Sequence, residues 1–557
     1  MNSIEIPIGK RTFLYRLFEI LPAFLSYGSL ILLVALSLLN PFLAAVYLLI
    51  IILTAFIKSI GVAFRTIQGY HNMQQAQKVD WNQRFQDVID TQKQKEVLLQ
   101  DTSTWRKRNH AKNLAYIASD HSAPRAQDIY QAVIIAMYNE QYETLLPTIQ
   151  AIADSSFDQK RIMVVLAYEQ RGGPATKSVV NKLQQTFQDT FLHFYTVEHP
   201  ADLANEVQGK GGNITYAGKF LQRCIEKEDI DPDNVIITTL DSDNRPHKQY
   251  LSYTAYEYVV HPNRLNVSFQ PIALFLNNIW DVPAPMRVIA TGNSFWNIIS
   301  SMRPHMLRNF ASHSQGLSPL IGMKFWSVRT IVEDGHQFWR SFFYFDGKYS
   351  VVPIYVPIYQ DAVLSDTYKK TLYAQFKQVR RWAYGASDIP YVAVRLFTAK
   401  RRIPFFYGLS YLLRLIDSHV SWASLPLLVA FGGWVPLLLN QESSRSIVAH
   451  ELPEFISLIQ RVAMIGILIS VFLAFKMLPP RPARYKKHRS ILMALQWLLM
   501  PITSILYGAL AAFNAQTHLA LGKYLDTFDV TDKAIKPHTK NKSYRCFSRC
   551  ALCRAAY

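Results

Sequence analysis

The chain has 557 residues, half of them hydrophobic, and its 59 Lys and Arg outnumber its 40 Asp and Glu to give a formal net charge of +19. This length allows more than one domain, and four cysteines are too few for a disulfide-rich secreted scaffold. Such a charge suits a nucleic-acid-binding protein, or a membrane protein with basic segments beside anionic headgroups. The basic residues gather next to apolar blocks, as in 481–489, and no nucleic-acid-binding motif is present, so the sequence favours a membrane protein without a nucleic-acid partner.

Two apolar stretches near the N-terminus predict membrane-spanning helices. Residues 21–39 and 41–63 each come close to the roughly 20 apolar residues that cross a bilayer. A cleaved signal peptide is the poorer interpretation, because two long apolar stretches follow one another without a small-residue cleavage site. Basic residues before the first stretch place the N-terminus inside, so two crossings return the chain to the cytosol near Phe64.

Residues 65–402 are polar and mixed, and they predict a soluble region in two parts. The first part, 65–127, is rich in Gln, Lys and Asp, which indicates a helical polar linker. In the second part, short apolar strands alternate with helical stretches, and the strands are QAVIIAMYNE, RIMVVLAYEQ and NVIITTLDSD. This alternation predicts an α/β domain over 128–402 with a mostly parallel, Rossmann-like sheet whose ligands bind at the carboxyl ends of the strands.

The chain becomes apolar again after the predicted α/β domain. Segment 403–415 is short and carries an arginine, which favours an interfacial helix, whereas 418–439 and 457–477 predict membrane spans. Segment 491–513 either crosses the membrane or lies in the interface, broken at Pro501, and the basic tail after it favours the cytosol. We therefore expect four spans with interfacial helices, in a multi-pass protein of the plasma membrane whose active site faces the cytosol.

The expected organisation has five parts. They are two N-terminal membrane helices (1–64), a polar linker (65–127), the α/β domain (128–402), interfacial helices with about two membrane helices (403–523) and a cytosolic tail (524–557). Cys546, Cys550 and Cys553 lie in that tail. Lipidation, metal binding and a dispensable end are alternatives that the sequence leaves open for them.

Asp241-Ser242-Asp243 directly follows the predicted strand VIITTL. Residues two apart on a strand leave on the same side, so both carboxylates face one place. Paired carboxylates hold a hard divalent cation through oxygen ligands, and such a cation neutralises a diphosphate. A capped turn is the alternative, since Asp-Ser-Asp-Asn is also favourable turn sequence.

Gln378, Arg381 and Trp382 lie at positions i, i+3 and i+4 of a predicted helix, so one face presents all three side chains. Arginine forms bidentate bonds to phosphate oxygens. Tryptophan offers a flat apolar surface to the C–H face of a sugar, and glutamine bonds hydroxyls. Arg380 points about a quarter-turn away. An amphipathic helix with an interfacial Trp is the alternative.

Together with Glu333-Asp334 between them, and in this order between two membrane-length apolar blocks, these motifs resemble those of the processive family-two glycosyltransferases, which include the cellulose, chitin and hyaluronan synthases. The resemblance runs from the first apolar block to Lys533, because Phe528–Lys533 (FDVTDK) resembles the gating loop of cellulose synthases. It implies a GT-A-type domain inserted between membrane helices, a UDP-sugar donor, a glycan acceptor, and Mg²⁺ or Mn²⁺ as cofactor.

The resemblance also implies a role for each motif. Asp334 would be the catalytic base and Glu333 its orienting partner, although Val332 replaces the Thr that usually precedes them. A helix-capping pair is the alternative for these two carboxylates. The remaining roles would be metal binding by Asp241 and Asp243, acceptor and pyrophosphate binding by Gln378, Arg381 and Trp382, and nucleotide-sugar binding by Tyr138, Asn139, Glu140, Glu169, Lys210, Asp241, Thr531 and Lys533.

One of the implied donor contacts departs from the family pattern, and another rests on a short motif that resembles the family's Lys-rich loop between strands. Glu169 stands where the family often carries Asp, which leaves the contact to the base or ribose open. Lys210-Gly211-Gly212-Asn213 is a Gly-rich sequence with a cation, which we expect to form a turn whose backbone approaches a phosphate closely. A surface turn explains the same residues equally well.

The leading hypothesis is a membrane-embedded inverting hexosyltransferase that extends a β-linked polysaccharide from a UDP-sugar. Transfer of a single sugar to a lipid or membrane-bound acceptor is the alternative. A non-catalytic membrane scaffold or transporter is the alternative of another class. The sequence leaves open the donor sugar, the linkage, the oligomeric state and whether an accessory translocation subunit takes part.

Overall fold

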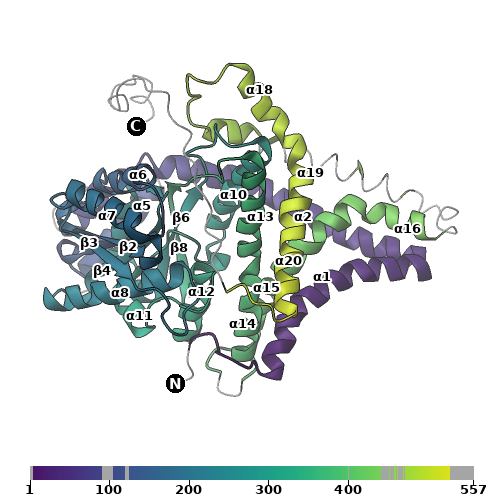
Figure 1. Ribbon diagram of the computed structural model, residues 1–557, viewed down its shortest axis with the longest axis horizontal. Helices are drawn as coiled ribbons and strands as arrows, with labels where there is room; N and C mark the ends of the chain where they lie inside the picture. The colour runs from purple at the N-terminus through teal and green to yellow at the C-terminus, as the bar shows by residue number, and fades with distance from the viewer. Residues whose placement is uncertain are drawn as a thin grey trace.

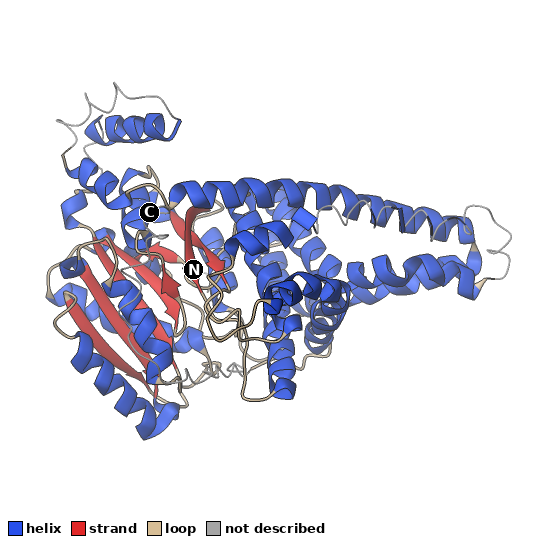
Figure 2. Ribbon diagram, turned by 90° about the horizontal axis from the view of Figure 1, so that it is seen from above, coloured by secondary structure: helices blue, strands red, loops and turns tan. Residues whose placement is uncertain are grey.

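The computed structural model describes residues 4–90, 105–119, 124–398, 401–440 and 471–526, with single residues and short pieces between 451 and 469. An α/β body lies at one end of the molecule, and long helices lie beside it and project away from it (Figure 1). Seen from above, the strands gather in the α/β body, and the projecting part is helical throughout its described length (Figure 2).

The sheet of the α/β body has eight strands in the order β3-β2-β1-β4-β7-β6-β8-β5. The first four strands in that order are parallel, β7 is antiparallel to both of its neighbours, and β6 and β8 are parallel. The strands are β1 (Tyr130–Met137), β2 (Ile162–Glu169), β3 (His193–His199), β4 (Val235–Asp241), β5 (Arg245–Pro246), β6 (Val267–Leu274), β7 (Ser314–Gly316) and β8 (Ser350–Tyr359). The sheet is therefore mixed, with a parallel half that holds the three strands predicted from sequence.

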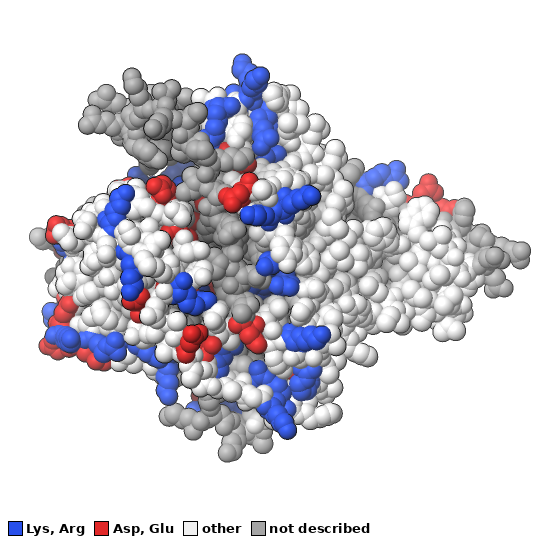
Figure 3. All heavy atoms as spheres, viewed as in Figure 1, with Lys and Arg blue, Asp and Glu red and all other residues white. Residues whose placement is uncertain are grey.

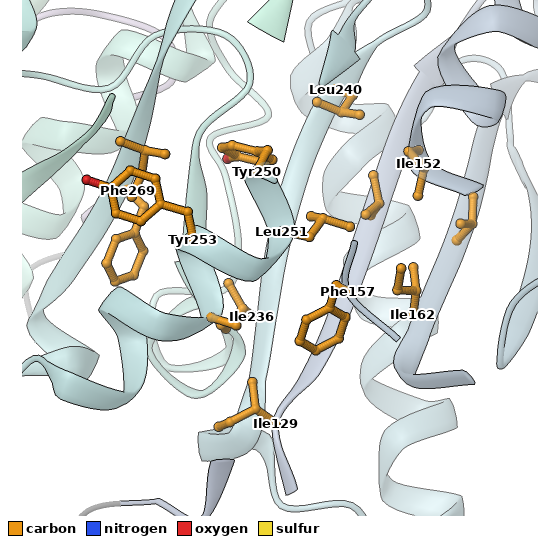
Figure 4. Close-up of a cluster of buried hydrophobic side chains, with 14 of the residues drawn as sticks. Ile129, Ile152, Phe157, Ile162, Ile236, Leu240, Tyr250, Leu251, Tyr253 and Phe269 are labelled. Atoms are coloured by element: carbon orange, nitrogen blue, oxygen red, sulfur yellow. The ribbon is translucent and has the colours of Figure 1, made fainter. Parts of the chain in front are cut away.

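Helices cover both faces of this sheet, which explains why its central strands are almost continuously apolar. Val133 and Ile135 of β1 belong to one buried cluster, whereas Ala132 and Ile134 face the other. Figure 4 shows part of the first cluster, where Leu251 packs with side chains of the neighbouring strands. The covering helices are α6 (Tyr142–Ala153), α7 (Gly173–Phe187), α8 (Lys210–Lys227), α9 (Tyr250–Val260) and α11 (Leu317–Gly322). The predicted α/β domain, flanked in sequence by apolar helices, is confirmed.

The segment expected to be a polar linker contributes to the core instead. α3 (Trp81–Ile89) and α5 (Trp105–Ser119) follow α2 (Pro41–Ala76), which continues well past the expected boundary at residue 64. Trp81, Phe85 and Val88 are buried against the first cluster. Their spacing of four and three residues puts them on one helix face, and the many polar residues between them occupy the other face.

Four helical segments within the described residues are long and apolar enough to cross a membrane. They are α1 (Phe13–Leu39), α2, the helix pair Phe405–Leu439 and the segment His488–Ala520. Few charged side chains appear on the projecting part in the space-filling view (Figure 3), as a lipid-facing surface requires.

The segments expected after the α/β domain have three different outcomes. The stretch 403–415, expected as a separate interfacial helix, is continuous with the next stretch in α15 (Phe405–Phe431), because no helix-breaking residue separates the two. The stretch 491–513, left open by the sequence, lies inside the fourth candidate span. Most of 457–470 lies outside the described residues.

A second group of helices joins the sheet to the candidate spans. They are α10 (Ala284–Ser301), α12 (Glu333–Tyr344), α13 (Tyr368–Ala383) and α14 (Asp388–Leu396), whereas α16 (Val435–Leu439), α18 (His488–Leu495), α19 (Met500–Thr503) and α20 (Leu510–Ala520) lie within the candidate spans. α13 packs against α20, and α14 packs against α1 and α15. Any site between the sheet and α13 or α14 therefore lies next to the candidate membrane helices.

Candidate active site

One cavity of about 710 Å³ lies at the carboxyl ends of β1, β2 and β4 and reaches α15. Polar side chains follow these strands where each ends, which is where ligands bind in such sheets. The residues predicted from sequence that line it are Tyr138, Glu140, Glu169, Lys210, Asp241, Asp243, Glu333, Asp334, Gln378, Arg381 and Trp382. The structure thus brings together residues that are as far apart in the chain as Tyr138 and Trp382.

Lys210 links the two carboxylate motifs. Its Nζ lies 2.9 Å from Oδ1 of Asp241 and 3.1 Å from Oδ2 of Asp334. Glu333 Oε1 lies farther away, at 3.9 Å. Burial alone would lower the pKa of the Lys210 ammonium, but Asp241, Asp334 and Glu333 outweigh burial and raise it. The lysine therefore stays charged, and its ammonium group connects the end of β4 to the start of α12.

The glycine-rich sequence at Lys210 forms the first turn of α8, and the expected turn between strands is therefore wrong. Asn213 donates hydrogen bonds to the carbonyl oxygens of Met137 (3.2 Å) and Ala167 (2.9 Å), which ties this helical turn to the ends of β1 and β2. A Cβ on Gly211 would lie 2.4 Å from the carbonyl oxygen of Ser327. Glycine is required there because the helix packs backbone against the connection that leads to Glu333.

The Asp-Ser-Asp motif is held in place by hydrogen bonds to two neighbouring segments. Ser242 Oγ donates to Glu140 Oε1 at 2.9 Å, and the other oxygen of Glu140 accepts from the Tyr138 backbone N–H at 2.7 Å. Asp243 Oδ2 accepts from the backbone N–H of Asp361 at 3.0 Å. Glu140 therefore connects the ends of β1 and β4 through these two hydrogen bonds.

The oxygen donors at this motif suit a hard divalent cation. The Asp241 side chain is 37% exposed and opens onto the cavity, although Lys210 contacts one of its oxygens. No group of three or more His, Cys, Asp or Glu side chains in the described part of the chain forms a complete metal cage. The motif therefore offers two carboxylates as part of the ligand set of a cation.

Glu333 and Asp334 are the first two residues of α12, where the helix N-terminus favours negative charge. Glu333 is only 2% exposed, and burial, together with the neighbouring Asp334, raises the pKa of its carboxyl to about 8. Lys210 offsets part of that shift. The two neighbouring carboxyls therefore differ in environment, with Asp334 the more exposed of the pair.

His313 is a buried neighbour of Asp334 that the sequence did not reveal. Its Nδ1 donates to the Phe310 carbonyl oxygen at 3.0 Å, and its Nε2 accepts from Trp326 Nε1 at 3.2 Å. Burial lowers the pKa of His313, which agrees with these contacts of a neutral ring. Nδ1 lies 3.8 Å from Asp334 Oδ1 and so borders the base candidate without forming a hydrogen bond to it.

The three residues of the Gln-x-x-Arg-Trp motif lie on α13, and all of them line the cavity as their helical spacing predicts. Gln378 Oε1 accepts from Gln375 Nε2 at 3.0 Å. The Trp382 ring lies 6.1 Å from that of Phe275. Arg380 is not among the cavity-lining residues, in agreement with its predicted direction.

The remaining predicted donor contacts divide into three cases. Glu169 is paired with Arg171, whose guanidinium lies 5.1 Å from the ring centre of Tyr138. Burial raises the pKa of Glu169, and Arg171 offsets part of the shift. Asn139 is exposed and does not line the cavity, because the chain turns outward after Tyr138. Thr531 and Lys533 lie outside the described residues.

A scan against protein-family models finds no match. A search of curated proteins also finds none. Solved structures that are similar to this chain are a mannosyltransferase from Pyrobaculum calidifontis in complex with GDP-Man and Mn²⁺ (13% identity, TM-score 0.38, covering 71% of this chain and 87% of that one), S. aureus TarS 1–349 with UDP-GlcNAc (11%, 0.34, 60% and 90%) and the same TarS fragment with UDP (11%, 0.33, 71% and 93%). At these levels of similarity the function has to be argued from the geometry of the site.

Proposed function

We propose that this chain is a membrane-embedded inverting glycosyltransferase that transfers a sugar from a UDP-sugar to a growing β-linked polysaccharide. The observation that carries the proposal is the single cavity onto which the Asp-Ser-Asp, Glu-Asp and Gln-x-x-Arg-Trp motifs all open. Each motif by itself could have a purely structural role, as a turn, a helix cap or an amphipathic helix. Those explanations give no reason for the three motifs to share one cavity.

In the proposed reaction Asp334 is the base. The acceptor hydroxyl attacks the anomeric carbon on the face opposite the diphosphate, and its proton passes to the Asp334 carboxylate. The new C–O bond forms as the bond from the anomeric carbon to the diphosphate oxygen breaks. UDP leaves with that electron pair, and the configuration at the anomeric carbon inverts.

Lys210 supports this reaction from between the two motifs. Its ammonium lies within hydrogen-bonding distance of Asp241, at the donor end, and of Asp334. A fixed positive charge in a buried site stabilises the negative charge that develops on the leaving diphosphate, without reorganisation during the reaction. Arg381 adds a second positive charge on the acceptor side, and this charge offsets part of the rise in the pKa of Glu333.

Asp241 and Asp243 would hold Mg²⁺ or Mn²⁺ together with the donor. When bound, the cation neutralises charge on the diphosphate and makes it a better leaving group. The chain itself supplies carboxylate oxygens here and too few other ligands for a complete cage among the described residues. We therefore expect the cation to bind more tightly when the nucleotide is bound, and the nucleotide to bind more tightly when the cation is bound.

The acceptor would lie along the other part of the cavity, beside Gln378 and Trp382. Its wall continues to Ser418, His419 and Trp422 of α15, which belongs to a candidate membrane span. This continuity supports an acceptor that reaches the base from the membrane side. It also favours the second candidate function, in which one sugar is added to a lipid-linked acceptor.

A nucleotide-release assay tests the proposal. The detergent-solubilised full-length protein is given UDP-glucose, UDP-N-acetylglucosamine or GDP-mannose with Mg²⁺ or Mn²⁺, and free nucleoside diphosphate is measured. We expect cation-dependent release from a UDP-sugar. Release from no donor would overturn the proposal and favour a scaffold or transporter. The length of the labelled product in membranes separates polysaccharide extension from addition of a single sugar.

A further inference from the structure

Arg308 is a cavity-lining cation that the proposed reaction does not use. It lies in the connection between α10 and β7, is half-buried and lines the cavity. Within the described residues, its guanidinium has no hydrogen bond and no carboxylate close enough for an ion pair. The guanidinium lies over the Trp339 ring, whose centre is 5.6 Å from the guanidinium carbon.

The surrounding charges leave the Arg308 cation poorly compensated. Burial lowers the pKa of Arg308, and Asp388 offsets burial only in part. The Oδ1 atom of Asp388 is already committed to His336 Nδ1 at 2.6 Å. A guanidinium stays protonated at any physiological pH, and even a partly buried charge without a contacting counter-ion is unfavourable. An anion on the ligand would remove that cost.

This cation is distinct from those that serve the donor. Lys210 Nζ lies 2.9 Å from Asp241 and 3.1 Å from Asp334, at the donor end of the cavity. The carboxylate whose field acts on Arg308 is Asp388, at the start of α14. One cavity therefore presents positive charge at two places, and the donor diphosphate accounts for the first.

The walls near Arg308 suit an amphipathic occupant. The rings of Trp296 and Phe310 lie 4.7 Å apart in an edge-to-face arrangement, and both line the cavity with Trp422 of α15. α15 belongs to a candidate membrane span, so an occupant of this part of the cavity borders the apolar helices. A ligand with an apolar chain and an anionic head group would suit both the aromatic wall and the Arg308 guanidinium.

We propose that Arg308 forms an anion subsite for the acceptor, which takes the phosphate of a membrane lipid that carries the acceptor sugar. This inference rests on the proposed function and names the class of its acceptor. The lipid phosphate binds the guanidinium through charge-assisted hydrogen bonds, while the acceptor hydroxyl is presented to Asp334. Free inorganic phosphate shares the same chemistry but lacks the chain that contacts the aromatic wall.

The test measures equilibrium binding of radiolabelled farnesyl phosphate and of farnesol to the full-length protein in neutral detergent, without a donor. We expect farnesyl phosphate to bind at least about tenfold more tightly than farnesol, and Arg308→Gln to remove most of that preference. Inorganic phosphate should displace farnesyl phosphate only at much higher concentration. Equal binding of phosphate and alcohol, or displacement by inorganic phosphate at a similar concentration, would overturn the proposal.

Control variants separate the subsite from a general effect on folding. Arg303→Gln removes a nearby arginine that does not line the cavity and should keep the preference for farnesyl phosphate. Arg308→Lys keeps the charge and should retain part of it. If Arg308→Gln keeps full selectivity while binding nucleotide normally, the subsite is wrong.

Nucleotide release distinguishes failure of this subsite from failure of the proposed function. If the protein shows no preference for farnesyl phosphate but still releases nucleoside diphosphate, the lipid-phosphate acceptor is wrong and the proposed transferase activity stands. Selectivity present with no release from any donor would support the anion subsite and remove the transferase.

Discussion

Lys210 Nζ lies 3.1 Å from Oδ2 of Asp334, across 124 residues of chain. The contact joins the first turn of α8 to the first turn of α12. It places a charged ammonium beside the carboxylate to which we assign the acceptor proton. Much of the site's electrostatic balance depends on this one side chain.

Removing the Lys210 charge should cost both activity and stability. Lys210→Met leaves Asp241, Asp334 and Glu333 without the cation that they surround. We expect turnover to fall about 100-fold or more, and the free energy of unfolding to fall by about 3 kcal/mol, as for other broken buried ion pairs. Nucleotide release and thermal unfolding in detergent measure the two effects. Lys219→Met, exposed on the same helix, should change neither.

The pH dependence of stability should reveal Glu333. The pKa of this carboxyl is raised to about 8 in the folded protein, so the folded state holds a proton that the unfolded state has lost. Its contribution to stability is therefore greatest below the ordinary glutamate pKa and falls as the pH rises to about 8. Glu333→Gln removes this titration.

Thermal unfolding of the wild type and of Glu333→Gln at about pH 5, 6.5 and 8 checks that sign. As the pH rises, the unfolding temperature of the variant should increase relative to that of the wild type. A constant difference over that range would mean that Glu333 is not protonated in the folded protein.

Close packing at Gly211 should make it intolerant of a side chain. A Cβ there would lie 2.4 Å from the Ser327 carbonyl oxygen and 3.2 Å from Glu333 Cβ. Gly211→Ala should displace the start of α12 and lower turnover about tenfold, with a loss of roughly 1–3 kcal/mol in stability. Gly28→Ala, where the added Cβ meets no atom within 4 Å, is the control and should leave turnover unchanged.

The segment before the first candidate span should stabilise the α/β body through Glu5. Oε2 of Glu5 lies 2.7 Å from Nη1 of Arg340, and Nη2 of Arg340 donates to the Met323 and Phe325 carbonyl oxygens. Burial alone would raise the pKa of Glu5, but Arg340 and Ser327 outweigh it and lower the pKa. Its stabilisation is therefore present above the ordinary glutamate pKa and is lost as the pH falls below it.

Glu5→Gln should accordingly lower the unfolding free energy at about pH 7 by roughly 2–3 kcal/mol, and should differ less from the wild type at about pH 4. Glu226→Gln, exposed on α8, provides the comparison. An equal loss at both pH values would contradict the ion pair.

The sequence predicted those parts of the site that depend on local pattern. Asp241 and Asp243 were placed by the apolar run before them, since a buried strand must end where its polar residues begin. Gln378, Arg381 and Trp382 were placed on one face by helical spacing alone. Parallel strands then bring such ends to the same edge of the sheet.

Other residues of the site could not be found from sequence because their contacts depend on how distant segments cross. His313 reaches Asp334 because β7 inserts antiparallel between β4 and β6, and no local pattern records that insertion. Arg308 lies in an irregular connection and resembles any surface arginine. Lys210 to Asn213 looked like a turn because glycines usually mark one, whereas here they allow a helix to pack closely.

The measurement that tests the central claim most directly is made on Asp334→Asn, with nucleotide release and nucleotide binding followed in the same preparation. The account predicts that release and transfer fall to background, because the acceptor proton has no base, while UDP binding in the presence of Mg²⁺ or Mn²⁺ stays close to that of the wild type. Asp366→Asn, exposed on the connection before α13, should behave as the wild type. Near-normal transfer by Asp334→Asn would contradict the account.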